Sequence, residues 1–268
     1  MTRTVAAGVA ALRRRLATAC LAEDAPPERH GFDFASGTRL LRFTTAMHRR
    51  WFRVECHGIE RLPRGAVMLV ANHGSHVLSW DGAMIMTSCL LEAEPPRLVH
   101  GMAEHRLMEL PLLGGAARRI GATDGRREPC AAILRARGVV LTFPEGTAAL
   151  RRPFRERYRL SPLGHGFMHV ALATGAPVVP VAVIGAEEEA PLVLRPAWLA
   201  RLVRTPVAPL TPTLVVPLPA KYRIHFGPAM QFEGPGSPEA VAHRVAEVQR
   251  ALQGLVEQGL ARRRHVYF

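Results

Sequence analysis

Residues 66–81 read AVMLVANHGSHVLSWD and combine a strand signal with a candidate functional loop. Residues 66–71 form a continuous apolar run of strand length, which is typical of a parallel strand buried on both faces. The polar loop that follows leads into a helix predicted from about Asp81 to Leu91. In α/β proteins, loops at the carboxyl ends of strands carry the chemistry. This stretch therefore predicts an α/β protein whose chemistry lies close to His73.

The alternation of strand and helix continues along the chain. Apolar runs predict further strands at residues 139–143 and 178–184, and residues 97–100 are predicted to form a short strand. Apolar spacing and stop signals predict helices at residues 104–119, 128–137, 163–174 and 238–264. We therefore expect an α/β fold with a mostly parallel central sheet flanked by helices.

Four segments lie outside this regular alternation. A basic amphipathic helix near residues 5–16 and a second helix at 38–52 precede the first strand. The first of these either lies on a membrane or packs against its own domain, and we expect an N-terminal helical membrane-contact segment. Residues 190–220, rich in proline and leucine, form a second candidate membrane contact. Residues 222–226 alternate between apolar and polar side chains, which predicts an edge strand.

Composition indicates an anionic partner. The 268 residues include 35 basic and 22 acidic side chains, which gives a net charge of +13. Nucleic acid, an acidic lipid headgroup and a phosphorylated substrate all suit such a surface. Against nucleic acid, the sequence has no helix-turn-helix, zinc-finger or RNP-like motif. No apolar run reaches the length needed to cross a bilayer, so we expect no membrane-spanning helix.

The cysteine and histidine spacings predict no metal site. Four cysteines are scattered without CxxC spacing, which also argues against disulfides and for a reducing compartment. His165 and His169 lie four residues apart, but no HExxH motif or neighbouring carboxylate accompanies them. Arginines in the middle of the N-terminal helix are unlike a secretory signal. We therefore expect a cytoplasmic protein that holds neither a metal nor another cofactor.

His73 and Asp81 are a candidate catalytic pair. A histidine with a carboxylate partner acts as general base, because the carboxylate fixes the tautomer and stabilises the imidazolium. Asp81 stands at a helix start, where backbone N–H groups hold a carboxylate. The alternative is a loop histidine beside an N-cap aspartate. Ser75 lies in no Gly-x-Ser-x-Gly elbow, so we interpret it as a loop hydroxyl.

A second segment, Phe143-Pro144-Glu145-Gly146-Thr147, also ends a predicted buried strand. Such a turn exposes a carboxylate and backbone N–H groups at the same sheet edge as the first loop. By itself it would be interpreted as an ordinary strand-to-loop turn. It indicates a functional site only together with the segment that contains His73.

The two segments together resemble the motifs of the lysophospholipid and glycerolipid acyltransferase superfamily, which has Asn-His…Asp and Phe-Pro-Glu-Gly motifs after successive strands. Residues 121–127 match the position of the family's glycine-to-arginine motif, and residues 175–181 look like its proline-containing fourth motif. The resemblance covers residues 54–227 and is closest to the monoacylglycerol and diacylglycerol acyltransferase branch. It implies N-terminal helices at residues 1–52 and an acyltransferase domain at 53–268.

What the resemblance implies is transfer of a fatty acyl group from acyl-CoA or acyl carrier protein to a lipid hydroxyl. His73 would act as general base, oriented by Asp81, without an acyl-enzyme intermediate. The family spacing of four residues between His and Asp selects His76 as an alternative base, whereas the Asn-His dipeptide at the strand end selects His73. We favour His73, because the strand end fixes its backbone.

The resemblance also implies substrate-binding residues. Glu145, Gly146 and Thr147 would position the acceptor's hydroxyls, while Arg126 and Arg127 match the motif arginine that binds a phosphorylated acceptor. Residues 123–125 replace the hydrophobic residues that precede this arginine in the family. The partners are then a membrane lipid acceptor, the acyl donor and an anionic membrane surface, with the protein peripherally associated with the cytoplasmic membrane.

Two other function classes fit parts of the sequence. A lipid esterase or thioesterase would use the same histidine to activate water, and would release free fatty acid. A nonenzymatic protein that binds anionic lipid would use the positive charge alone, and would show salt-sensitive vesicle binding without turnover.

Overall fold

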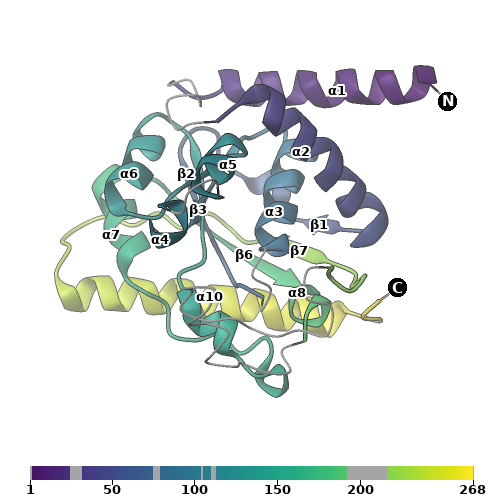
Figure 1. Cartoon of the computed structure of the whole chain (residues 1–268). Helices are drawn as coiled ribbons and strands as arrows, with labels where there is room; N and C mark the ends of the chain where they lie inside the picture. Colours follow the sequence, from purple (N-terminus) through teal and green to yellow (C-terminus); the bar gives the residue numbers. More distant parts are fainter. Residues whose placement is uncertain are drawn as a thin grey trace.

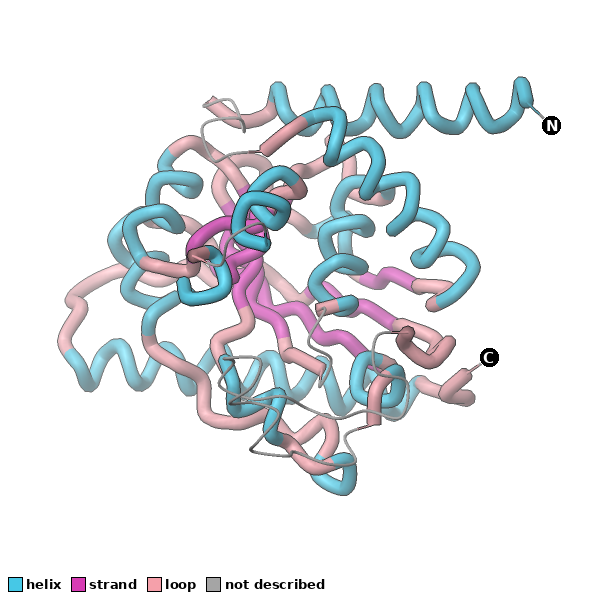
Figure 2. Tube along the Cα trace, viewed as in Figure 1, coloured by secondary structure: helices cyan, strands magenta, loops and turns pink. Residues whose placement is uncertain are grey.

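The computed structural model describes residues 2–24, 32–74, 79–103, 105–109, 113–191 and 216–267. Within these residues, one sheet runs through the centre of the molecule and helices cover both of its faces (Figures 1 and 2). The sheet has the strand order β1-β7-β6-β2-β5-β3-β4. All neighbouring strands are parallel except the antiparallel pair β6 and β7. The expectation of an α/β fold with a mostly parallel sheet is confirmed.

The described strands are β1 (Glu55–His57), β2 (Val67–Ala71), β3 (Val99–Ala103), β4 (Ala122–Asp124), β5 (Val139–Thr142), β6 (Val178–Ile184) and β7 (Arg223–Phe226). The α-helices are α1 (Thr2–Leu21), α2 (Phe34–Ala46), α3 (Trp80–Leu91), α4 (His105–Met108), α5 (Leu113–Arg119), α6 (Arg127–Arg135), α7 (Gly166–Thr174), α8 (Ala186–Glu189) and α10 (Pro238–Arg262). Shorter turns are the π-helical η2 (Met47–Trp51) and the 3-10 helices η3 (Ile59–Arg61), η4 (Gly146–Arg151) and η5 (Phe154–Glu156).

β2 lies in the middle of the sheet and is buried on both faces. Its residues alternate between two core clusters, as the two-residue period of a strand requires. Met68 and Val70 pack in the cluster that holds α6, α7 and α10. Val67 and Leu69 face the cluster that holds α3 and Phe52. This double cover explains why residues 66–71 show an uninterrupted apolar run.

β7 corrects one sequence expectation, because it is not an edge strand. It lies between β1 and β6, and all four of its residues are buried. The alternation of residues 222–226 is real, since Ile224 and Phe226 join the core. The polar side chains on its other face are also covered, with His225 stacked on His57 at 4.7 Å between ring centroids. Helix α10 packs on this face, since a Cβ on Gly259 would lie 3.0 Å from His225 Nε2. The edge of the sheet is instead the three-residue strand β1, which is too short to give a sequence signal of its own.

The N-terminal helices pack on one another and on α3. Contacts join α1 to α2, and join both of these helices to α3, and α1 lies along the outer side of this group (Figure 1). Leu16 and Ala19 of α1 are buried in a third apolar cluster with Leu41 of α2. None of the described helices is both long and apolar enough to cross a membrane. Most of the predicted 190–220 membrane contact lies outside the described residues.

Candidate active site

Three neighbouring parallel strands bring the candidate site together. β2 lies between β5 and β6, and all three run in the same direction. Their carboxyl ends therefore meet at one edge of the sheet. His73 follows β2, Glu145 follows β5, and Glu187 follows β6. The topology thus places residues from three distant parts of the chain side by side.

Asn72 fixes the backbone immediately before His73. Its Nδ2 donates a hydrogen bond to the carbonyl oxygen of Val183 at 3.0 Å, and its Oδ1 accepts from the N–H of Val183 at 2.7 Å. The amide therefore continues the β2–β6 pairing by one position, since it offers the same donor and acceptor as a backbone unit. The side chain is fully buried. This pairing explains why an asparagine stands at the strand end.

The structure brings the predicted catalytic pair into contact. His73 Nδ1 lies 2.7 Å from Asp81 Oδ2. The same carboxylate accepts from the N–H groups of Gly74 and Gly82, each at 2.7 Å, and from Ser79 Oγ at 2.9 Å. A carboxylate with this many donors stays ionised and rigid. His73 Nδ1 is thereby occupied, so Nε2 is the ring nitrogen that can accept a proton.

Neighbouring charges make His73 a stronger proton acceptor and keep Asp81 ionised. Burial lowers the pKa of His73, but the opposing effect of Asp81 is joined by Glu145 and Glu187, so the pKa lies above its usual value. Burial raises the pKa of Asp81, yet His73 and the donating N–H groups bring it below its usual value. The ring of His73 also packs on Phe143, with 4.5 Å between centroids.

The loop that carries Asp81 is tightly constrained. Ser79 precedes α3 in the left-handed region with a φ of 46°, an uncommon conformation for a residue other than glycine. A Cβ on Gly82 would lie 2.8 Å from Ser79 Oγ and 3.3 Å from the Phe143 ring. Glycine therefore lets α3 start close to both groups. Residues 75–78, which include His76 and Ser75, lie outside the described residues.

Glu145 forms part of a buried ion-pair network. Its Oε1 accepts from the N–H of His73 at 3.3 Å, and its Oε2 accepts from the N–H of Ser161 at 2.7 Å and from Arg152. Arg152 also donates to Glu187 and, at 3.4 Å, to the carbonyl oxygen of His73. The Glu145 side chain has 0% exposure, so its carboxylate faces protein groups. Glu145 and Arg152 therefore hold the backbone of His73 from both sides.

The other predicted binding residues lie at different distances from this network. Gly146 and Thr147 follow Glu145 directly, in η4. Arg126 and Arg127 lie at the start of α6 after β4, which is separated from β2 by β3 and β5. Arg126 Nε donates to Asp124 at 2.8 Å, and both arginines are exposed. They lie at the same sheet edge as His73, but among the described residues no hydrogen bond or ion pair joins them to His73 or Asp81.

Three buried glutamates in α8 are site residues that the sequence analysis missed. Glu187, Glu188 and Glu189 are each at most 3% exposed. Arg152 pairs with Glu187, Tyr158 and Arg263 donate to Glu188, and Tyr222 donates to Glu189. Burial raises the pKa of Glu187, and raises that of Glu189 well above its usual value. The available signal was their place directly after the apolar run of β6, where strand-end loops carry chemistry.

This chain is similar to known proteins in sequence and in fold. The family model named Acyltransferase matches residues 53–184. An uncharacterized protein of Mycobacterium tuberculosis is 35% identical, in an alignment that covers 100% of this chain and 77% of that protein. A mouse protein, "DGAT1/2-independent enzyme synthesizing storage lipids", is 25% identical, with 78% of this chain and 61% of that protein covered.

A solved structure confirms the fold. The crystal structure of PlsC, the 1-acyl-sn-glycerophosphate (LPA) acyltransferase of Thermotoga maritima, superposes with a TM-score of 0.57. It covers 87% of this chain and 82% of its own, at 19% identity. With the family match and the ordered strand-end motifs, these relatives confirm the family that the sequence resembles. The chain belongs to the acyltransferase family, within the lysophospholipid and glycerolipid acyltransferase superfamily.

Proposed function

We propose that this acyltransferase moves a fatty acyl group from a thioester donor, acyl-CoA or acyl carrier protein, to a hydroxyl of a glycerolipid acceptor. The observation that carries the proposal is the 2.7 Å contact between His73 and Asp81 at the carboxyl end of β2. A neutral imidazole in this contact has one nitrogen held and the other directed to proton transfer. Acyl transfer from a thioester to a hydroxyl uses such a base.

The proposed reaction is a direct transfer. His73 Nε2 takes the proton of the acceptor hydroxyl as its oxygen attacks the thioester carbonyl carbon. A new C–O bond forms, the C–S bond breaks, and the imidazolium returns the proton to the departing sulfur, which leaves as a thiol. Asp81 stays ionised throughout and stabilises the transient imidazolium. No acyl-enzyme forms, and His73 ends each cycle neutral.

Glu145 takes a positioning role in this proposal. Its carboxylate and Arg152 contact the N–H and the carbonyl oxygen of His73, respectively. These bonds hold the imidazole where the acceptor oxygen arrives, and misplacement of a base by a fraction of an ångström is costly. Gly146 and Thr147, which continue from Glu145, would then line the acceptor's path, since the Gly146 Cβ direction is open.

The acceptor is a lysophospholipid or a mono- or diacylglycerol, and one observation favours the uncharged acylglycerols. Arg126, proposed to bind an acceptor phosphate, is paired with Asp124. His105 Nδ1 lies 2.8 Å from the same carboxylate, so Asp124 already contacts the side chains that a phosphate would need. The likeness to an animal enzyme whose name concerns storage lipids supports the same choice. Arg127 would remain for an anionic acceptor or donor.

We further propose that α2 and η2 contact an anionic membrane surface from the cytoplasmic side. Leu40, Phe43, Met47 and Trp51 recur at helical spacing, with Phe43 52% and Trp51 37% exposed. Exposed arginines flank this stripe at residues 39, 42, 49 and 50. A helix with an apolar stripe and basic flanks suits the interface of an acidic bilayer.

The stripe lies close to the candidate site. Phe43 packs near Trp80, with 6.0 Å between the ring centroids. Trp80 directly precedes Asp81 at the start of α3. A membrane bound along the stripe would therefore present its lipids beside the catalytic loop.

The experiment that tests the proposed function uses labelled acyl-CoA with a panel of acceptors: lysophosphatidic acid, other lysophospholipids, monoacylglycerol and diacylglycerol. A new acyl ester on one acceptor, absent with His73→Ala, supports the proposal, and the panel repeated with acyl carrier protein identifies the donor. Free fatty acid without an acceptor-dependent ester would indicate an esterase or thioesterase instead. Vesicle binding with neither product would indicate a nonenzymatic lipid-binding protein. Full activity of His73→Ala with loss in His76→Ala would identify the other histidine as base.

A further inference from the structure

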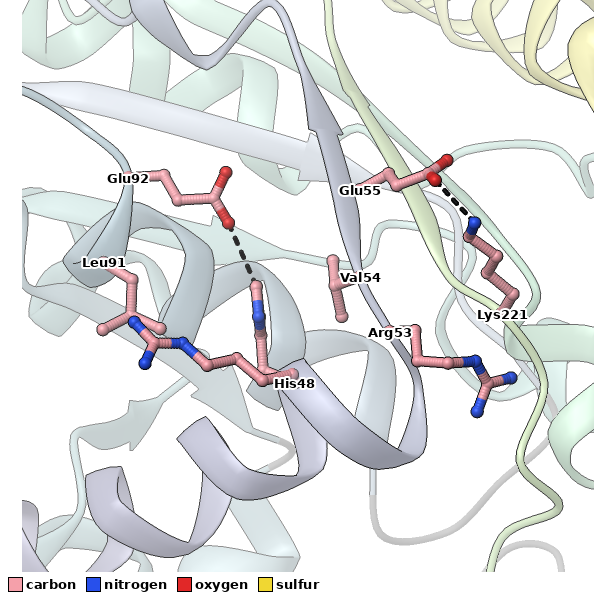
Figure 3. Close-up of a pocket in the computed structure, with 8 residues that line it drawn as sticks. His48, Arg53, Val54, Glu55, Leu91, Glu92 and Lys221 are labelled. Atoms are coloured by element: carbon pink, nitrogen blue, oxygen red, sulfur yellow. Dashed lines mark ion pairs between the residues drawn. The ribbon is translucent and has the colours of Figure 1, made fainter. Parts of the chain in front are cut away.

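A cluster of three metal-binding side chains lies away from the candidate active site. His48 comes from η2, Cys56 from β1, and Glu92 from the C-cap of α3. Each offers one ligand atom, and these atoms all lie within 4.8 Å of one another. Figure 3 shows His48 and Glu92 directed toward each other, with 3.4 Å between Nε2 and Oε1.

The separation between the His48 and Glu92 ligand atoms fits a tetrahedral ion. Zinc binds imidazole nitrogen and carboxylate oxygen at about 2.0–2.1 Å, so two such ligands in a tetrahedron stand about 3.3 Å apart. The observed His48–Glu92 separation is 3.4 Å. A nitrogen, a thiolate sulfur and a carboxylate oxygen are also the ligand types that zinc uses, whereas magnesium and calcium bind oxygen ligands.

The cluster is buried at His48 and reaches solvent at Glu92. The His48 side chain is 5% exposed and that of Glu92 38% exposed. Both residues line a pocket of about 410 Å³ (Figure 3), through which an ion could enter and a water could supply the fourth ligand. His48 Nδ1 is buried and has no hydrogen-bond partner among the described residues. Hydrogen bonds to the described residues therefore hold His48 at Nε2 but not at Nδ1.

The cations that line the same pocket do not prevent binding. Lys221 pairs with Glu55 at 2.6 Å, and Arg53 donates to the carbonyl oxygens of Trp51 and Pro219. A divalent ion bound by one thiolate and one carboxylate forms a cluster with no net charge, which does not repel Arg49. A thiolate and a carboxylate in a partly buried site are, in turn, most stable when they are compensated by a cation.

We propose that His48, Cys56 and Glu92 bind a divalent transition-metal ion, with Zn²⁺ as the best fit. The Cys56 thiol gives its proton to solvent as the sulfur–metal bond forms. Ser88 Oγ, now 2.9 Å from His48 Nε2, loses that hydrogen bond to coordination. The ion would tie the edge strand β1 and η2 to the end of α3, the helix that begins with Trp80 and Asp81.

The expectation of no metal site rested on spacing along the chain, and this cluster escapes that criterion. Along the chain, Cys56 lies 8 positions after His48, and Glu92 lies 36 positions after Cys56. Neither gap matches a short metal motif. The pairing of β1 with β7 and the packing of η2 on α3 bring them together in the folded chain.

The test uses the untagged full chain after treatment with a chelator. We expect one Co²⁺ per chain, with a thiolate-to-cobalt charge-transfer band, and displacement of Co²⁺ by Zn²⁺. Cys56→Ser should remove the band, and Glu92→Gln should weaken Zn²⁺ binding by at least the roughly 10- to 100-fold that loss of an outer-shell partner costs. Cys130→Ala is the matched control, since this buried cysteine lies in the opposite core and should keep the band.

Other outcomes would overturn the proposal. The first is a wild-type chain with no charge-transfer band and no stoichiometric Zn²⁺. The second is a band that is lost in Cys130→Ala but kept in Cys56→Ser. The third is equal Zn²⁺ affinity in wild type and Glu92→Gln. Glu92 is partly exposed, so Glu92→Gln keeps the test decisive if Cys56→Ser fails to fold. Thermal unfolding gives a second readout, because an ion that binds only the folded chain raises Tm with its concentration.

Discussion

Arg152 donates a hydrogen bond to the buried carboxylate of Glu145, and both side chains are almost fully removed from solvent. The arginine is only 4% exposed at its side chain. A buried guanidinium needs close compensation, which Glu145 and Glu187 provide together. This pair joins the loop after β5 to the backbone of His73 and so links the stability of the fold to the position of the candidate base.

Replacing Arg152 by Met should therefore destabilise the protein strongly. The change leaves two buried carboxylates without their cation, and removing one partner of a buried ion pair costs about 3–5 kcal/mol. The free energy of unfolding, measured by urea denaturation, reports this cost. Arg155→Met is the matched control, since Arg155 is 84% exposed and pairs with an exposed glutamate. A loss for Arg152→Met as small as that of the control would show that the network does not stabilise the fold.

The sequence predicted the parts of the site whose signals are local. The apolar run of β2, the Asn-His dipeptide and the Phe-Pro-Glu-Gly turn each lie within a few residues, and their order identified the family. The strands predicted at β5 and β6 match the observed ones to within one residue. Strands buried on both faces leave continuous apolar runs, which are hard to mistake.

The parts that the sequence did not predict depend on distant partners. β1 and β4 have three residues each, and only pairing with a neighbouring strand makes them strands. Glu187, Glu188 and Glu189 have the pattern of a solvated charge run. Their burial follows from Arg152, Tyr158 and Tyr222, which lie about 30 positions or more from them in the sequence. No local pattern can reveal such compensation.

Replacing Asp81 by Asn should lower activity and shift its pH dependence. The pKa of His73 is raised by Asp81, Glu145 and Glu187 against the effect of burial. The base works only when neutral, so kcat/KM should rise with pH through a midpoint above the ordinary histidine value of about 6.5. The Asp81→Asn substitution removes one negative charge beside the imidazole, so the midpoint should move to lower pH. The rate at the plateau should fall by roughly 10²- to 10⁴-fold, because the tautomer is no longer fixed.

A profile of kcat/KM against pH, measured for both forms, checks this prediction. Asp33→Asn is a suitable control, since Asp33 caps α2 through the Ser36 N–H and does not contact His73 among the described residues. Its midpoint should match that of the wild type. An unchanged midpoint in Asp81→Asn would mean that another group sets the ionisation of the base.

Replacing Asn72 by Ala should affect both stability and catalysis. The change leaves the N–H and carbonyl oxygen of Val183 buried without the partners they now have. Each unsatisfied buried group costs about 1–3 kcal/mol. Loss of the anchor also frees the backbone of His73, so kcat should fall more than KM rises. Thermal denaturation and steady-state kinetics measure the two effects, and a variant with wild-type values for both would remove Asn72 from the positioning role.

Replacing Phe43 or Trp51 by Ser should weaken binding to vesicles of phosphatidylglycerol and phosphatidylethanolamine. These side chains are 52% and 37% exposed, and transfer of a large apolar side chain from water is worth about 1.5–3 kcal/mol. Each substitution should therefore reduce vesicle affinity by roughly 10-fold, and added salt should reduce it further by screening the neighbouring arginines. Phe154→Ser is matched to Trp51→Ser, since Phe154 is also 37% exposed but lies in η5. Vesicle sedimentation that shows equal losses for Phe154→Ser and Trp51→Ser would contradict a membrane contact through α2 and η2, because both would then reflect apolar exposure in general.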